Sequence, residues 1–205
     1  MSEGIVVQAA VPEGVVLPLS PELLEGAVRH VLTEERVGEA EISLAFVSDE
    51  EIARMNEAYL RHEGATDVIS FALHGEGERP LGDVYVGVEQ AARQAQEIGV
   101  SHEQELLRLA VHGTLHVLGW EHPDEGERAQ TPMYLRQEEL LTSFLSRSSS
   151  AASRARFSTA GVDASRASTW RRVVMGTRYG PPQRSVAIAP RASSSARWRN
   201  ASRSS

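Results

Sequence analysis

Three of the seven histidines of this 205-residue chain lie within one eleven-residue stretch, at positions 112, 116 and 122. Helix-forming residues precede this stretch, and Ser101 and Gln104 have the spacing of a capping box, so a helix is predicted to start near His102. At about 100° per residue, His112 and His116 lie one turn apart on nearly the same face of this helix. Both imidazoles can therefore reach one ion.

Gly119 determines where the third histidine lies. In a continuing helix, His122 would point about 120° away from His116 and lie about 9 Å further along the axis, too far to share an ion. Glycine adopts the left-handed conformation that ends helices, so the chain can turn back and bring His122 to the same place. Three neutral imidazoles and a water form an open tetrahedral site, which is typical of catalytic zinc.

We therefore predict that His112, His116 and His122 bind one Zn²⁺, although nickel or another divalent ion could occupy the same ligands. The alternative is that His112 and His116 are core histidines of a buried apolar helix. That arrangement would leave buried imidazoles without partners, which costs free energy. The third histidine after a helix-ending glycine favours the metal site.

The composition of the chain changes sharply near Ser146. Residues 1–145 hold 9 arginines and 27 acidic residues, a formal charge of −18, whereas residues 146–205 hold 12 arginines and one acidic residue, a charge of +11. The second part is rich in Ser, Ala and Arg and lacks periodic apolar spacing, so it cannot bury enough apolar surface to offset its ordering entropy. We predict a metal-dependent domain over residues 1–145 and a disordered basic tail over residues 146–205. The tail either contacts nucleic acid or is an extension without function, such as translation past a shifted reading frame.

Cysteine is absent from the sequence, which excludes a disulfide framework and a thiolate metal site. No basic start followed by an apolar run occurs, and no apolar stretch approaches the ~18 residues of a membrane span. We expect a soluble cytoplasmic protein that does not associate with a membrane.

Apolar periodicity and capping signals predict the remaining elements. The run over residues 66–73 has few charges and is expected to be central in the sheet. A strand that leads directly into a helix, as near Ser48, is typical of a compact α/β layer. Strands are expected at 4–10, 41–47, 66–73 and 82–88, and helices at 21 to about 35, from 48, at 89–98 and at 132–145.

Residues from about 41 to 145 resemble the YbeY family of bacterial endoribonucleases, which are rRNA maturation factors. The resemblance rests on Met55-Asn56 and Tyr59 ahead of the run Ala-Thr-Asp-Val-Ile-Ser-Phe at 65–71, on Leu-Gly-Asp-Val at 81–84, and on the histidine triplet with Gly119 between its second and third members. It implies an α+β fold, a small mixed sheet of about four strands covered by helices. It also implies that the three histidines hold zinc on a central helix and the following loop.

The activity implied by the resemblance is that of a single-strand-specific, zinc-dependent endoribonuclease, acting in small-subunit rRNA 3′-end maturation and ribosome quality control. The implied partners are single-stranded RNA, in particular rRNA of the small subunit, and the small ribosomal subunit with its assembly factors. Zinc can lower the pKa of a bound water to about 7. Whether the resulting hydroxide attacks phosphorus or takes a proton from the 2′-hydroxyl stays open, and the catalytic residues stay unassigned. Glu121 is either a proton carrier or an acid that orients an imidazole.

The chain departs from the family pattern in ways that keep alternatives open. An arginine usually follows the aromatic residue that corresponds to Tyr59, but this chain has Leu60 there, followed by Arg61; the family's proline before the Thr-Asp pair is Ala65. Arg61 either supplies the phosphate contact from one position later or is a solvated loop residue. The missing arginine favours, as an alternative, a non-catalytic zinc-binding ribosome assembly factor. A metzincin-like metallopeptidase is less favoured, because such enzymes need a glutamate where this chain has Gly113.

The charge of −18 opposes tight general binding to phosphates, since that affinity depends on cationic contacts. A local basic cleft would still attract RNA, because the field depends on the distribution of charge as well as on its total. Five arginines are candidates for such a cleft: Arg54, Arg61, Arg79, Arg93 and Arg108.

Overall fold

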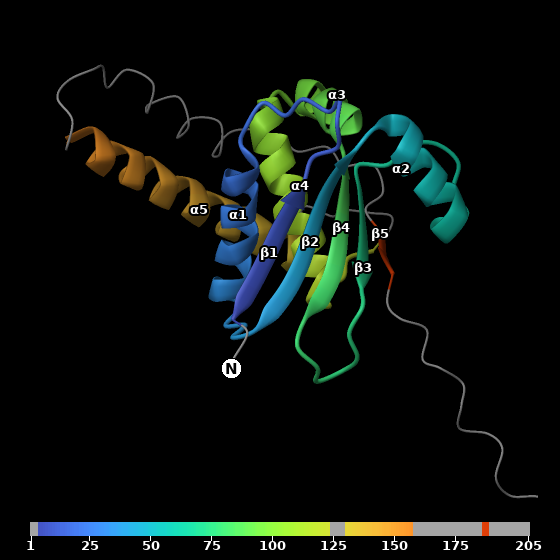
Figure 1. The fold of residues 1–205 in the computed structure, drawn as a ribbon, viewed down its shortest axis with the longest axis horizontal. Coiled ribbons are helices and arrows are strands. Elements are labelled where there is room, and N and C mark those ends of the chain that lie inside the picture. The colour runs from blue at the N-terminus through green and yellow to red at the C-terminus, as the bar shows by residue number, and fades with distance from the viewer. Residues whose placement is uncertain (1–3, 124–129, 158–185, 189–205) are drawn as a thin grey trace, which may run out of the picture.

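A mixed β-sheet forms the centre of the computed structural model, which describes residues 4–123, 130–157 and 186–188 (Figure 1). The strands lie in the order β1-β2-β4-β3-β5, with β1, β2 and β4 parallel and β3 antiparallel to β4. The predicted α+β class and mixed sheet are confirmed, with four main strands and a short fifth strand beside β3. The strands are β1 (Ile5–Ala10), β2 (Ala40–Val47), β3 (Val68–Ala72), β4 (Leu81–Gly87) and β5 (Val186–Ile188).

Serine residues start three of the helices in the described part of the chain. The hydroxyls of Ser20, Ser48 and Ser101 each accept a hydrogen bond from the backbone N–H three residues on, and at Ser101 the capping box is complete. None of the described helices is both long and apolar enough to span a membrane. The helical elements are α1 (Pro21–Glu34), α2 (Asp49–Met55), the π-helical turn η1 (Asn56–Leu60), α3 (Val88–Ile98), α4 (His102–Val117) and α5 (Pro132–Phe157).

The main core lies between one face of the sheet and the helices α1 and α4 (Figure 1). Strand β2 shows why: its residues alternate between buried Ile42, Leu44 and Phe46 and the exposed Glu41 and Ser43. Burying each such apolar side chain contributes about 1.5–3 kcal/mol. Helix α5 packs against α1 and α4 and brings Met133, Leu140 and Phe144 into the same core.

Strand β4, not β3, lies at the centre of the sheet, so the expectation for residues 66–73 is wrong in this respect. The apolar character of β3 has a different cause. Val68 is buried in the main core, while its neighbour Ile69 is buried on the opposite face with Val47 and Ile52. Because both faces of β3 are covered, apolar residues are favoured on both sides of this strand. Its neighbour on the outer side is the three-residue β5.

The helix predicted from Ser48 changes to a π-helical turn at Asn56. The wider turn ends at Arg61, which has a left-handed backbone with φ +56°. Ile52 is buried, but Tyr59, which a regular α-helix from Ser48 would place on the same face, is exposed. The change of helical period is the reason, since a π-turn shifts the following side chains around the axis.

Helix α5 continues to Phe157 and so crosses the domain boundary predicted near Ser146. Beyond it, only β5 belongs to the described residues. Residues 158–185 and 189–205 lie outside them, and the division into a domain over residues 1–145 and a basic tail stays a prediction.

Candidate metal centre

Gly113 fixes how α4 lies on the sheet. A Cβ atom at this position would lie 2.4 Å from Val84 Cγ1, 2.9 Å from Ser70 Oγ and 3.1 Å from Val68 Cγ2. The helix backbone therefore contacts β3 and β4 directly at this point. Because successive helical residues differ by about 100°, His112, the residue before Gly113, points away from the sheet along the flank of α4.

A glycine turn ends α4 as predicted. Gly119 has φ +86°, its N–H donates to His116 O at 3.0 Å, and the N–H of Trp120 donates to Leu115 O at 3.0 Å. These bonds form the left-handed helix end for which glycine is preferred. The indole of Trp120 donates to Glu35 Oε2 at 3.1 Å, which ties the turn to the end of α1.

The turn brings the three histidines together. His112 Nε2 lies 3.1 Å from His116 Nε2 and 3.3 Å from His122 Nε2, and one ligand atom from each residue falls within 4.8 Å of the others. Two nitrogens bound to one tetrahedral zinc at about 2.0–2.1 Å would lie ~3.3 Å apart. The spacing of the imidazoles therefore fits a metal ion.

The Nδ1 atoms, which face away from the centre of the cluster, determine which nitrogen of each ring carries the proton. His112 Nδ1 lies 2.7 Å from Gln137 Oε1, His116 Nδ1 lies 2.9 Å from Trp120 O, and His122 Nδ1 lies 2.9 Å from Pro123 O. These oxygens can only accept hydrogen bonds, so each Nδ1 carries the proton and each Nε2 offers a lone pair. Three lone pairs that face one another favour a cation between them.

Burial keeps His112 neutral. His112 and His116 are 4% and 5% exposed, whereas His122 is half-buried. Desolvation lowers the pKa of His112 well below its ordinary value, and the neighbouring His116 and Arg108 lower it further. A metal binds the neutral imidazole, so this environment suits a ligand.

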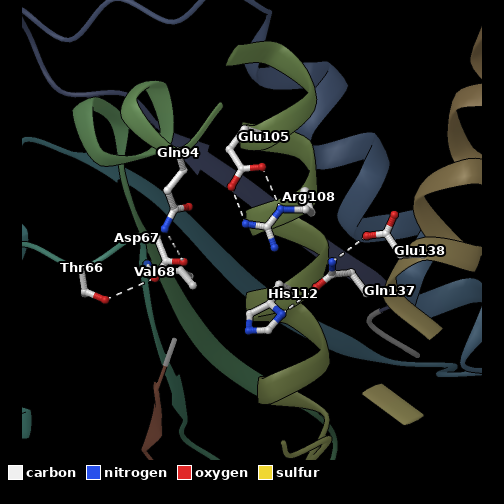
Figure 2. A network of polar contacts seen from close by, with 9 residues as sticks. All are labelled: Thr66, Asp67, Val68, Gln94, Glu105, Arg108, His112, Gln137 and Glu138. Carbon is white, nitrogen blue, oxygen red and sulfur yellow. Dashed lines mark hydrogen bonds and ion pairs between the residues drawn. The ribbon is translucent and has the colours of Figure 1, made fainter. Parts of the chain in front are cut away.

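A buried polar network lies beside His112 (Figure 2). One helical turn before it, Arg108 Nε donates to Glu105 Oε2 at 2.8 Å, and a second guanidinium nitrogen contacts the other carboxylate oxygen. On α5, Gln137 Nε2 donates to Glu138 Oε1 at 2.9 Å. Burial raises the pKa of Glu138, while the bond from Gln137 and the charge of Arg108 oppose the rise.

Gln137 is absent from the residues predicted for the site, yet it contacts a histidine of the cluster directly. The sequence contains a signal for it. In the part of α5 whose burial the structure describes, residues 132–148, the buried residues form a stripe at helical spacing, and Gln137 is its one polar member, with a fully buried side chain. The members of the stripe are Met133, Gln137, Leu140, Leu141 and Phe144.

Glu121 orients none of the three imidazoles; backbone carbonyls and Gln137 do so instead. Its side chain is exposed, beside His122 in the chain. The remaining possibility for Glu121, a proton carrier, stays a prediction.

The five arginines do not form a basic cleft in the described part of the chain. Four of them pair with carboxylates, two within their own helix and two with a distant segment, and the fifth, Arg61, is exposed and forms no ion pair with a described residue. Leu60 packs beside Ile52 in the smaller apolar cluster. The four pairs are Arg54–Glu50, Arg79–Glu41, Arg93–Asp49 and Arg108–Glu105.

The sequence family follows from comparison with known proteins. The family model described as Endoribonuclease YbeY matches residues 18–145. The chain belongs to the YbeY endoribonuclease family. It is 45% identical over 135 residues to the endoribonuclease YbeY of Halalkalibacterium halodurans, an alignment that covers 60% of this chain and 82% of that relative. The YbeY protein of Geobacillus thermodenitrificans is 42% identical over 135 residues, covering 60% of this chain and 85% of the relative.

A solved structure has a similar fold. The solution structure of a Thermotoga maritima protein superposes with a TM-score of 0.50 at 23% sequence identity, covering 79% of this chain and 99% of that one. The YbeY match includes α4, the glycine turn and all three histidines. This chain is therefore a nuclease of the hydrolase class by family, with a three-histidine cluster able to hold a metal.

Proposed function

We propose that this chain is a zinc-dependent, single-strand-specific endoribonuclease. In this proposal it acts in the cytoplasm, in small-subunit rRNA 3′-end maturation and ribosome quality control. The observation that supports it is the convergence of three imidazole Nε2 atoms, with every Nδ1 bonded outward, in a chain of the YbeY family.

In the proposed site, His112, His116 and His122 are the zinc ligands. Bound zinc would supply Lewis-acid stabilisation of charge at phosphorus and lower the pKa of a water. RNA reaches the cluster from the side of His122, because the other two imidazoles are buried. Arg61, exposed and without an ion pair to a described residue, is our candidate for the phosphate contact that Leu60 cannot make.

Gly113 disfavours the metallopeptidase alternative on structural grounds. A metzincin needs its glutamate directly after the first histidine, with the carboxylate beside the metal. Position 113 instead faces β3 and β4 with no space for a Cβ atom. A glutamate there would be directed into the sheet, so the fold has no place for that base.

The second candidate is a zinc-binding ribosome assembly factor that does not cut RNA. The observation that favours it is electrostatic: residues 1–145 carry a formal charge of −18, and four of the five candidate arginines are paired with carboxylates. Weak intrinsic affinity for phosphates is expected of such a surface. In this case the small ribosomal subunit or its assembly factors would bring the protein to RNA.

Cleavage of an end-labelled single-stranded RNA containing the small-subunit rRNA 3′ region separates the two candidates. The full chain is used, because α5 continues past residue 145. We expect zinc-dependent cutting by the unmodified protein, loss of cutting in His116→Ala, and retention in the control His102→Ala, whose histidine starts the same helix outside the cluster.

Two other outcomes have distinct meanings. One bound zinc without cutting by the unmodified protein would contradict the self-sufficient nuclease and favour the assembly factor. Absence of zinc binding, measured on the same sample by metal analysis, would contradict the proposed metal centre itself.

A further inference from the structure

Gln137 joins the histidine cluster to a second element of the fold. Its side chain is fully buried on α5, 25 residues from His112 in the chain. The amide oxygen lies 2.7 Å from His112 Nδ1, and the amide nitrogen donates to Glu138 Oε1 at 2.9 Å (Figure 2). One amide group thus bridges an imidazole and a carboxylate.

The two bonds of Gln137 fix each other's direction. An amide has one accepting atom, the oxygen, and one donating atom, the nitrogen. Because the carboxylate of Glu138 can only accept when ionised, the nitrogen faces Glu138 and the oxygen faces His112. The oxygen in turn requires a proton on His112 Nδ1, which leaves the lone pair of Nε2 pointing toward His116 and His122.

The other two histidines are oriented differently. His116 and His122 both donate from Nδ1 to backbone carbonyls of the turn that follows α4, at Trp120 and Pro123. A main-chain carbonyl remains an acceptor whatever the side chain. His112 is therefore the one member of the cluster whose tautomer depends on the identity of a side chain, and that side chain belongs to α5.

Arg108 and Glu105, on α4, form an ion pair beside the hydrogen bonds that Gln137 makes. Both are buried, at 4% and 0% exposure, and they neutralise each other one turn before His112. Burial raises the pKa of Glu138, but the hydrogen bond from Gln137 and the positive charge of Arg108 oppose this rise. An ionised Glu138 accepts from Gln137 and cannot donate to it, so the amide keeps its orientation.

We propose that Gln137 is a positioning residue for the metal. By accepting the Nδ1 proton of His112, it holds this ligand in the tautomer that binds metal, so that metal affinity depends on the docking of α5 as well as on the histidines. This inference rests on the proposed metal centre. Bonds of this kind to a ligand imidazole typically change metal affinity about 10- to 100-fold.

The test measures Zn²⁺ affinity of the full chain by competition with a chromophoric chelator. We expect Gln137→Met, which keeps the approximate volume but lacks both polar atoms, to bind zinc about 10- to 100-fold more weakly. The matched control is Gln94→Met: Gln94 is also buried and donates to Asp67 Oδ2, but it makes no contact with the histidines. Its zinc affinity is expected to stay within about twofold of the unmodified protein.

Two further measurements separate positioning from general stability. In the metal-free protein above pH 7, long-range ¹H–¹⁵N correlation is expected to show the Nδ1–H tautomer of His112, and a mixture of tautomers in Gln137→Met. The double variant Gln137→Glu/Glu138→Gln exchanges the accepting and donating groups, so a carboxylate faces His112 and an amide supports it. We expect it to recover zinc affinity to within a few-fold.

The outcomes distinguish this inference from the proposed function. If the unmodified protein binds no zinc, the metal centre itself is wrong. If it binds zinc and Gln137→Met binds equally well, or the double variant loses as much affinity as Gln137→Met, then Gln137 does not position the ligand. The double variant and the tautomer of the unmodified protein decide the matter even if Gln137→Met does not fold.

Discussion

The histidine cluster has a helical half, His112 and His116, and a turn half, His122, and the fold constructs the two in different ways. The helical half is set by packing: α4 contacts β3 and β4 through Gly113, and both imidazoles are buried. The turn half is set by backbone conformation: Gly119 reverses the chain with φ +86°, and among the described residues only its chain neighbours come within 4 Å of where its Cβ would be. Two glycines six residues apart thus have unrelated reasons to be glycine.

Gly113→Ala is expected to have the largest effect. Alanine normally stabilises a helix interior relative to glycine by about 0.5–1 kcal/mol, but here the methyl group would overlap Val84 and crowd Ser70. Overpacking of this kind costs about 1–3 kcal/mol. We expect a lower free energy of unfolding in urea and weaker zinc binding, because α4 has to move away from the sheet.

The control for this variant is Gly26→Ala in α1. Its Cβ would lie 3.7 Å from the ring of Phe144, an ordinary contact, so alanine should leave stability unchanged or raise it by up to about 1 kcal/mol. Equal behaviour of the two variants would show that α4 does not lie as closely on the sheet as described.

Gly119→Ala is expected to lower the stability of the protein less than Gly113→Ala does. Its effect on zinc affinity should be large relative to this loss of stability. Alanine in the left-handed conformation costs about 1–2 kcal/mol, and no clash with another described residue adds to this. Relaxing the turn displaces His122 but leaves His112 and His116 in place. We therefore expect zinc affinity, measured by chelator competition, to fall more than the urea midpoint suggests.

Gly119→Asn provides the matched comparison, because asparagine tolerates the left-handed conformation better than alanine. Compared with Gly119→Ala, it should recover part of the lost stability and part of the lost zinc affinity. An asparagine variant as impaired as the alanine variant would mean that something other than backbone conformation limits this turn.

The two halves also differ in how far the sequence predicts them. The turn half follows from local rules, since the position of a helix-ending glycine relative to two histidines is visible in the sequence, and the structure has the predicted turn. The strands and helices with clear periodicity, such as β2 and α1, are likewise confirmed. These features depend on neighbours within a few residues.

The contacts of the helical half depend on residues far apart in the chain. Gln137 reaches His112 only because α5 packs on α4, and β3 has few charges because helices cover both of its faces. The π-turn after α2 has no clear local signal either, and it leaves Tyr59 exposed. Two of the four arginine ion pairs likewise join distant segments of the chain, Arg79–Glu41 and Arg93–Asp49, and composition does not predict them; the other two form within a single helix.

The smallest expected effect is on the pH dependence of stability in the metal-free protein, and it concerns the helical half of the cluster. Burial lowers the pKa of His112 in the folded state, whereas in the unfolded chain this pKa is about 6.5. As the pH falls below about 6.5, the unfolded chain gains a proton that the folded protein does not bind at this position. His112 therefore makes the folded state less stable at acid pH, by up to about 1.4 kcal/mol per pH unit, and the loss ends once the pH passes below the folded-state pKa.

We expect urea unfolding in the presence of a chelator to show this loss between pH 7.5 and 5.5, with a smaller loss in His112→Asn. His30, whose pKa is also lowered mainly by burial, contributes to both proteins and cancels in the difference. Equal pH dependence in the two proteins would mean that water reaches His112 when no metal is bound. The helical half would then require the ion for its closed arrangement, and the contrast with the turn half would hold only for the metal-bound protein.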